Sequence, residues 1–201
     1  QLVSRLADFL RSQPGVRIGL DLSDRLVPLA QEGFDLAIRH TATPPETHVA
    51  WRLCSTRSVL VASRAYLRRR GAPGLPADLS THDCLHYLRA GDAPAWQLVS
   101  QAAAGPATKV TVPVAGCIAA NNSEALREAA LSGLGIALLP DFSAQAALKA
   151  GRLVQVLPGW APEGSFAEHI YALRPYSPHV PRAVQALVAH LRATLREGFV
   201  T

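Results

Sequence analysis

The stretch from residue 120 to residue 142, ANNSEALREAALSGLGIALLPDF, restricts the fold more than any other part of the sequence. Side chains of the helix-capping type precede the amphipathic run SEALREAAL, and Gly133 and Gly135 interrupt that run. The apolar run GIALLP that follows has the length of a buried strand, and another helical pattern begins directly after it. A helix, a tight break, a buried strand and a second helix in this order indicate an α/β fold.

The same alternation of helical and extended patterns runs through the rest of the chain. Apolar residues at helical spacing predict a helix over residues 1–12, and the alternating run VRIGLDL predicts a strand over 16–22. A short helix over 23–33 and a strand over 34–40 complete a β-α-β unit. The remaining predicted elements are extended segments at 48–63 and 167–175, short strands with turns between 94 and 116, and a last helix that begins at Pro181.

Two long extended passes, near residues 53–62 and 167–174, bracket the middle of the chain. This pattern predicts two α/β lobes, one built from both ends of the chain and one from its middle. The first lobe is expected to combine residues 1–57 with 171–201, and the second to comprise 58–170. A cleft between two such lobes is a common place for a ligand.

Composition restricts the class of protein. The formal charge is +5, but the 20 basic residues are spread among acidic ones, which argues against direct nucleic-acid binding. No apolar run approaches the length of a membrane-spanning helix. Three cysteines without regular spacing and no signal peptide favour the reducing cytoplasm. The chain lacks any methionine, which predicts that it is a piece of a longer protein.

Motifs for catalysis and for cofactors are missing from the sequence. It contains no G-x-S-x-G elbow, no G-x-G-x-x-G fingerprint and no phosphate-binding P-loop, so neither an enzyme nor a cofactor is expected. His82, Cys84 and His86 would share one face of a strand, but no fourth metal ligand is evident, and no metal is predicted. A Ser-His-acid triad formed in space remains an open alternative, as does a redox role for Cys54.

Three segments together resemble a known family. They are GFDLAIRH, LVASRAYLRRRGAPGLPADLSTHDCLHY and ANNSEALREAALSGLGIALLPDF. In this order and over essentially the whole chain, they resemble the effector-binding domain of LysR-type transcriptional regulators, and most closely the glycine-cleavage-regulator-like branch. The resemblance implies two Rossmann-like lobes joined by two crossover strands, as in type 2 periplasmic binding proteins. It also implies that the family's first strand, with the loop after it, is missing here.

The resemblance implies a small-molecule effector bound between the lobes, and DNA contacts made only by an N-terminal winged helix-turn-helix that this chain lacks. Asn121 and Glu124 also match a capping box, and Arg39 can hold a carboxylate in two parallel bonds, so an anion is expected. Caps, strand ends and ordinary strand pairing are the competing interpretations of these residues. The predicted effector-binding residues are Arg39, His40, Thr41, Ser55, Thr56, Asn121, Asn122 and Leu134.

The resemblance further implies an antiparallel homodimer, possibly a tetramer at full length, with residues 1–22 of one chain against the helix at 123–132 of the other. Leu2, Leu6, Ala129 and Leu131 are the predicted interface residues. Two alternatives stay open. One is a stand-alone solute-binding protein of the same fold, and the other is a hydrolase with an activated serine or cysteine in the cleft.

Overall fold

The computed structural model describes residues 2–22, 29, 33–88, 94–101 and 108–199. The chain divides into two compact units. Unit 1 contains residues 1–56 and 167–199, and unit 2 contains residues 57–166. The sequence predicted these boundaries after residues 57 and 170.

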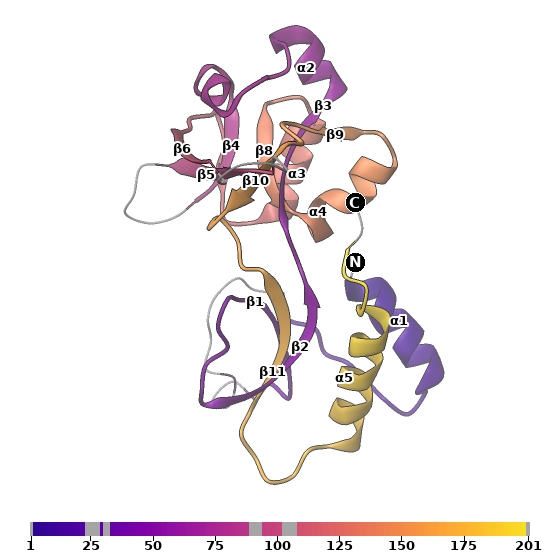
Figure 1. Cartoon of the computed structure of the whole chain (residues 1–201). Helices are drawn as coiled ribbons and strands as arrows, with labels where there is room; N and C mark the ends of the chain where they lie inside the picture. The colour runs from indigo at the N-terminus through magenta and orange to yellow at the C-terminus, as the bar shows by residue number, and fades with distance from the viewer. Residues whose placement is uncertain (1, 23–28, 30–32, 89–93, 102–107, 200–201) are drawn as a thin grey trace. The chain divides into compact units, whose positions relative to one another are not determined.

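A three-stranded antiparallel sheet forms the centre of unit 1 (Figure 1). Its middle strand, β11 (His169–Pro175), comes from late in the chain and pairs with two early strands, β1 (Ala37–His40) and β2 (His48–Ser55). The predicted extended segments at 48–63 and 167–175 therefore both exist, and the first of them consists of two consecutive strands. Because β11 lies between β1 and β2, unit 1 cannot assemble until the chain has returned from unit 2.

Two helices from opposite ends of the chain lie side by side in unit 1 (Figure 1). They are α1 (Leu2–Ser12) and α5 (Arg182–Thr194). The rings of Phe9 and His190 are 5.5 Å apart, and His190 Nε2 donates a hydrogen bond to the carbonyl oxygen of Arg5 at 3.0 Å. The apolar stripe predicted on the last helix is buried at Val184, Val188 and Leu191. Both helices thus bury the apolar faces from which they were predicted.

The strand predicted at residues 16–22 is not formed. The segment is extended but belongs to none of the sheets in the described part of the chain. Leu20 is 48% exposed and Leu22 is 80% exposed. An alternating pattern makes a segment suitable for a sheet, but only hydrogen bonds to a neighbouring strand hold it there. Residues 23–28 and 30–32 of the helix predicted next lie outside the described residues.

Unit 2 contains a five-stranded mixed sheet in the order β7-β4-β8-β3-β9. The parallel part consists of β4 (Cys84–Tyr87), β7 (Ala119–Ala120) and β8 (Ile136–Pro140), while β3 (Ser58–Ser63) runs antiparallel to β8 and to β9 (Leu153–Gln155). A second sheet, predicted as a small mixed sheet, is antiparallel throughout. Its strands are β10 (Trp160–Glu163), β5 (Ala95–Ser100) and β6 (Lys109–Pro113).

The described residues of unit 2 also form four helical segments, and the buried side chains of this unit form two apolar clusters. One cluster includes Tyr66, Trp96 and Leu138, and the other includes Leu126 and Leu139. The helical segments are α2 (Arg64–Arg70), a 3-10 helix η1 (Pro76–Thr81), α3 (Ser123–Leu131) and α4 (Asp141–Lys149).

The glycines after α3 have separate structural reasons. Gly133 has φ +77° and ends the helix, because Gly133 N donates to Ala130 O at 3.0 Å and Leu134 N donates to Ala129 O at 3.1 Å. These two bonds are the Schellman pattern, which requires a left-handed residue. A Cβ on Gly135 would lie 2.2 Å from the carbonyl oxygen of Asp83, so β8 can approach the start of β4 only without a side chain there.

Candidate functional site

A hydrogen-bonded cluster at one end of the unit 1 sheet joins several predicted site residues. His40 ends β1, and its Nε2 lies 2.8 Å from Oγ1 of Thr56, which directly follows β2. Thr56 Oγ1 donates to the carbonyl oxygen of Ala167 at 3.0 Å, and Thr56 N donates to that of Glu168 at 2.8 Å. The cluster therefore connects the residue at which the chain leaves unit 1 with the residue at which it returns.

Two further predicted residues adjoin this cluster through β11. Thr41 N donates to the carbonyl oxygen of His169 at 3.1 Å, and Ser55 is the strand partner of His169. Ser55 is exposed, whereas Thr56 is only 8% exposed. The structure thus brings His40, Thr41, Ser55 and Thr56 to the same end of one sheet.

The protonation of His40 follows from its partners. The hydroxyl of Thr56 donates its single proton in the hydrogen bond to the Ala167 carbonyl, so the hydroxyl oxygen accepts a hydrogen bond from His40 Nε2–H. Burial lowers the pKa of His40 from its usual value, and this effect exceeds the opposing one of the Ala167 carbonyl; the nearby His169 lowers it further. His40 is therefore a neutral ring at pH 7 with its proton on Nε2.

Arg39 does not share a face with His40. Arg39 pairs with Tyr171, which pairs in turn with Arg52, whereas His40 pairs with the buried Ile170. Successive side chains of a strand point to opposite faces of the sheet. The side chains of Arg39 and His40 therefore leave the sheet on opposite faces.

The start of α3 also differs from the prediction by one residue. Asn122, not Asn121, is the N-cap: its Oδ1 accepts from Glu124 N at 2.9 Å and from Ala125 N at 3.1 Å. Asn121 is exposed. Ser123 donates to Ser143 Oγ at 2.8 Å, because the Ser143 hydroxyl itself donates to Glu124 Oε1 at 2.9 Å. Side-chain hydrogen bonds therefore link the start of α3 to α4, and the side chain of Asn122 satisfies free N–H groups of the first turn.

Leu134 lies beyond the other end of the same helix. Ser132 follows Asn122 by ten residues along the helix, a rise of about 15 Å at 1.5 Å per residue. Leu134 is 40% exposed. The structure does not bring Leu134 together with Asn121 and Asn122, so they cannot touch one small ligand.

Two of the four predicted interface residues are already covered within the chain. Leu6 is 8% exposed and Ala129 is 7% exposed, which leaves them almost no surface for a partner. Leu2 and Leu131 are partly buried and keep some exposed surface. The predicted homodimer therefore has to use the latter pair and its surroundings.

The H-x-C-x-H pattern at 82–86 is engaged in local hydrogen bonds. His82 Nδ1 forms a hydrogen bond with the Tyr66 hydroxyl at 3.1 Å, and Cys84 Sγ donates to Leu79 O at 3.4 Å. Burial raises the pKa of Cys84 to about 12, and the neighbouring Asp83 adds to the shift. Among the described residues, no three His, Cys, Asp or Glu side chains are placed to hold a metal ion.

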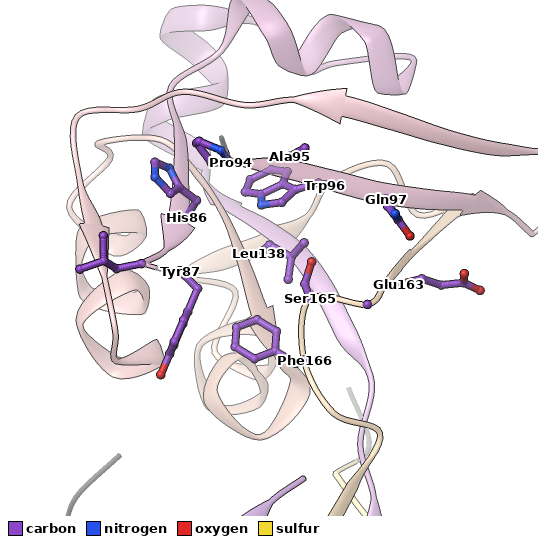
Figure 2. Close-up of a pocket in the computed structure, with 12 residues that line it drawn as sticks. His86, Tyr87, Pro94, Ala95, Trp96, Gln97, Leu138, Glu163, Ser165 and Phe166 are labelled. Carbon is purple, nitrogen blue, oxygen red and sulfur yellow. The ribbon is translucent and has the colours of Figure 1, made fainter. Parts of the chain in front are cut away.

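A pocket of about 450 Å³ lies within unit 2 and was not predicted (Figure 2). Four chain segments contribute to it: the end of β4 with Leu88, the start of β5 with Pro94, Leu138 of β8, and the end of β10 with residues 164–166. None of the predicted effector-binding residues lines it. These segments are far apart in the sequence and carry no shared motif, so the sequence alone could not predict that they form one pocket. The pairing of β10 with β5 in the structure brings them together.

Comparison with known families gives one match across the chain. Residues 1–196 match the family described as "LysR substrate binding domain". The chain is 33% identical over 190 residues to "Probable HTH-type transcriptional regulator LtrA" of Klebsiella pneumoniae, covering 93% of this chain and 59% of that protein. It is also 33% identical to "HTH-type transcriptional regulator PtxR" of Pseudomonas aeruginosa, covering 96% of this chain and 60% of that protein. The chain thus spans about 60% of the length of these relatives.

Solved structures give the same fold. The regulatory domain of CrgA, a LysR-type regulator of Neisseria meningitidis, is 25% identical with a TM-score of 0.81, covering 96% of this chain and 91% of that chain. Full-length AphB, a virulence activator of Vibrio cholerae, is 25% identical with a TM-score of 0.79, covering 96% of this chain and 63% of that chain. In the described part of the chain, no helix has the length and apolar character needed to cross a membrane. The chain belongs to the LysR substrate-binding domain family and has its type 2 periplasmic-binding-protein-like fold.

Proposed function

We propose that this chain senses a small anionic metabolite and thereby controls the DNA binding of a LysR-type transcription regulator. Its family membership makes it the effector-binding domain of such a regulator. DNA contacts would belong to a winged helix-turn-helix outside these residues, and the working form would be a homodimer. The effector would bind in the cleft between the two units, at the end of the unit 1 sheet.

The observation that carries this proposal is the hydrogen bonding of Thr56 to His40 and Ala167. Thr56 is the last residue of unit 1, and Ala167 is the first residue after the return. A ligand bound to His40 and Thr56 would interact with both chain crossings at once. A ligand shifts an equilibrium only when it binds one state better than another, and contacts at both crossings provide such a difference.

An anion is the ligand class that the chemistry of His40 supports. His40 is neutral without ligand, because burial lowers its pKa. A negative charge placed beside the ring would raise that pKa again and draw in a proton. The hydroxyl group of Ser55 lies at the same sheet end and can donate a hydrogen bond to an anion, whereas the Thr41 hydroxyl already donates to the carbonyl oxygen of Thr43 at 3.0 Å. Binding is therefore expected to strengthen as the pH falls from 8 to 6.

A thermal-shift screen of the chain against small carboxylates, with matched amines, tests the proposal. A carboxylate at 100 times its dissociation constant should stabilise the protein by about 2.7 kcal/mol. Thr56→Val and His40→Gln should abolish the shift, whereas Arg39→Ala, on the opposite face, should retain it. Equal shifts in all three variants, or shifts with amines alone, would exclude this site or this ligand class.

Two other functions are less well supported. A stand-alone solute-binding protein would share the fold, but the relatives described above are named as transcription regulators. A hydrolase would need a histidine beside its nucleophile, whereas the Ser123–Ser143 chain ends on Glu124. Neither alternative explains why His40 and Thr56 are linked at the chain crossings.

A further inference from the structure

We propose that the unit 2 pocket is a second ligand site, and that it takes a flat aromatic molecule with N–H donors and no negative charge. The site shares no residue with the effector site proposed above. Its volume of about 450 Å³ is within the usual range for small-molecule sites.

The walls of the pocket are aromatic and are fixed by the core. Trp96 and Leu138 are 3% and 2% exposed and belong to one apolar cluster, against which Phe166 also packs. Tyr87 packs against the other cluster, and its ring meets Phe166 edge to face at 5.4 Å and 84°. The pocket thus lies where the two apolar clusters of unit 2 meet. Figure 2 shows Phe166 and Trp96 on either side of Leu138. The half-buried rings of Tyr87 and Phe166, which the core holds in place, favour a flat apolar ligand.

The hydrogen bond that His86 makes to the backbone determines which of its ring nitrogens can accept a hydrogen bond from a ligand. His86 Nδ1 lies 3.2 Å from the carbonyl oxygen of Cys84. A carbonyl oxygen can only accept, so Nδ1 donates to it, and in the tautomer with one proton Nε2 is an acceptor. A ligand N–H is therefore the natural partner on this side of the pocket.

The opposite side of the pocket carries the negative charge. Glu163 and Gln97 are direct partners across β10 and β5, and Figure 2 shows both side chains on the side away from His86. Glu163 is also 3.0 Å from Lys109 Nζ, and both side chains are about half exposed, so this ion pair neutralises the carboxylate only in part. Of the lining residues that the structure describes, none is a lysine or an arginine.

These features select a ligand by charge. A carboxylate or phosphate on the ligand would find no cation among the described lining residues and would face Glu163. An ammonium or amino group would face Glu163 instead, and a cation is also attracted to aromatic faces. His86 at one end of the pocket and Glu163 at the other can accept hydrogen bonds, while the walls between them are apolar. An aromatic amine of one or two rings can pack against the walls and donate hydrogen bonds to both ends.

Tryptamine and indole-3-acetate test this proposal, because they share one ring system and differ in the sign of their charge. The chain has three tryptophans, so 15N labelling of the indole groups gives three signals. Trp96 lines the pocket, while Trp51 lies on β2 in unit 1 and serves as an internal reference. Tryptamine should move the Trp96 signal saturably and leave the Trp51 signal unchanged. Indole-3-acetate at the same concentration should move neither.

Variants separate the charge from the shape of the pocket. E163Q should weaken tryptamine binding by about threefold or more, since it removes an exposed carboxylate without changing size. Ala95→Phe, at an exposed lining position, should abolish the shift, whereas Ala77→Phe, at an exposed position of η1 outside the pocket, should not. Equal responses to both indoles, no response to either, or full binding by Ala95→Phe would overturn the proposal. His40→Gln should leave tryptamine binding intact, so failure of one site does not imply failure of the other.

Discussion

At the scale of single residues, the buried His40 links pH to the stability of unit 1. Its folded pKa is lowered by burial, so below the usual value of 6.5 the unfolded chain binds a proton that the folded chain does not. Stability therefore rises with pH through this range and is lost as the pH falls below about 6.5. Unfolding exposes this ring to water, and a negative charge bound beside it would also raise its pKa.

We expect His40→Gln to weaken this acid sensitivity. Urea unfolding at pH 7.5 and at pH 5.5 should show a smaller difference in the free energy of unfolding for the variant than for the parent chain. Because the pKa of His82 is also lowered by burial, some acid dependence should remain. His179→Gln, at an exposed position, should behave like the parent, and an unchanged difference in His40→Gln would contradict this account.

Gly135 gives a second prediction at this scale. Its missing side chain allows β8 to approach the Asp83 carbonyl, and the backbone cannot yield cheaply. Gly135→Ala should lower the free energy of unfolding by about 3 kcal/mol, the upper range for overpacking. Gly159→Ala is the matched control, since nothing lies within 4 Å of its Cβ position. Equal midpoints for both variants in urea unfolding would show that the close approach is not limiting.

At the scale of elements, the start of α3 depends on a single capping side chain. Asn122→Ala should cost about 1 kcal/mol, the usual value of an N-cap, because Glu124 N and Ala125 N lose their acceptor. Asn121→Ala should cost much less, since Asn121 is exposed and makes no cap. Thermal melting of the two variants measures the difference. A larger loss of stability in Asn121→Ala than in Asn122→Ala would show that Asn121 is the N-cap.

The elements also show what periodicity can and cannot predict. The patterns for α1, α3, β8 and α5 predicted these elements because each carries its own apolar face or run. The pattern at 16–22 was equally clear, yet no strand forms, because pairing depends on a neighbour rather than on the segment itself. The unit 2 pocket was missed for a related reason. His86, Trp96 and Phe166 meet only through strand pairing, which no local signal encodes.

At the scale of the whole molecule, burial separates the three cysteines. Cys54 and Cys84 are buried and Cys117 is exposed, and the pKa of Cys84 is raised to about 12. A thiolate, not a thiol, attacks disulfide reagents. An aromatic disulfide reagent at pH 8 should therefore label one thiol rapidly in the folded chain and three in urea. Cys117→Ser should remove the rapid phase, and rapid labelling in that variant would show that a buried thiol is accessible.

The bonding of Thr56 to Ala167 and Glu168 has a practical consequence for how this protein can be taken apart. Thr56 precedes unit 2 in the chain and Ala167 follows it, and the two are hydrogen-bonded to each other. Unit 2 is therefore inserted into unit 1 at a single point. A gene that omits residues 57–166 would leave two adjacent ends that a short glycine linker can splice. Each half could then be produced as its own polypeptide, and the first would retain the His40 cluster for titration in isolation.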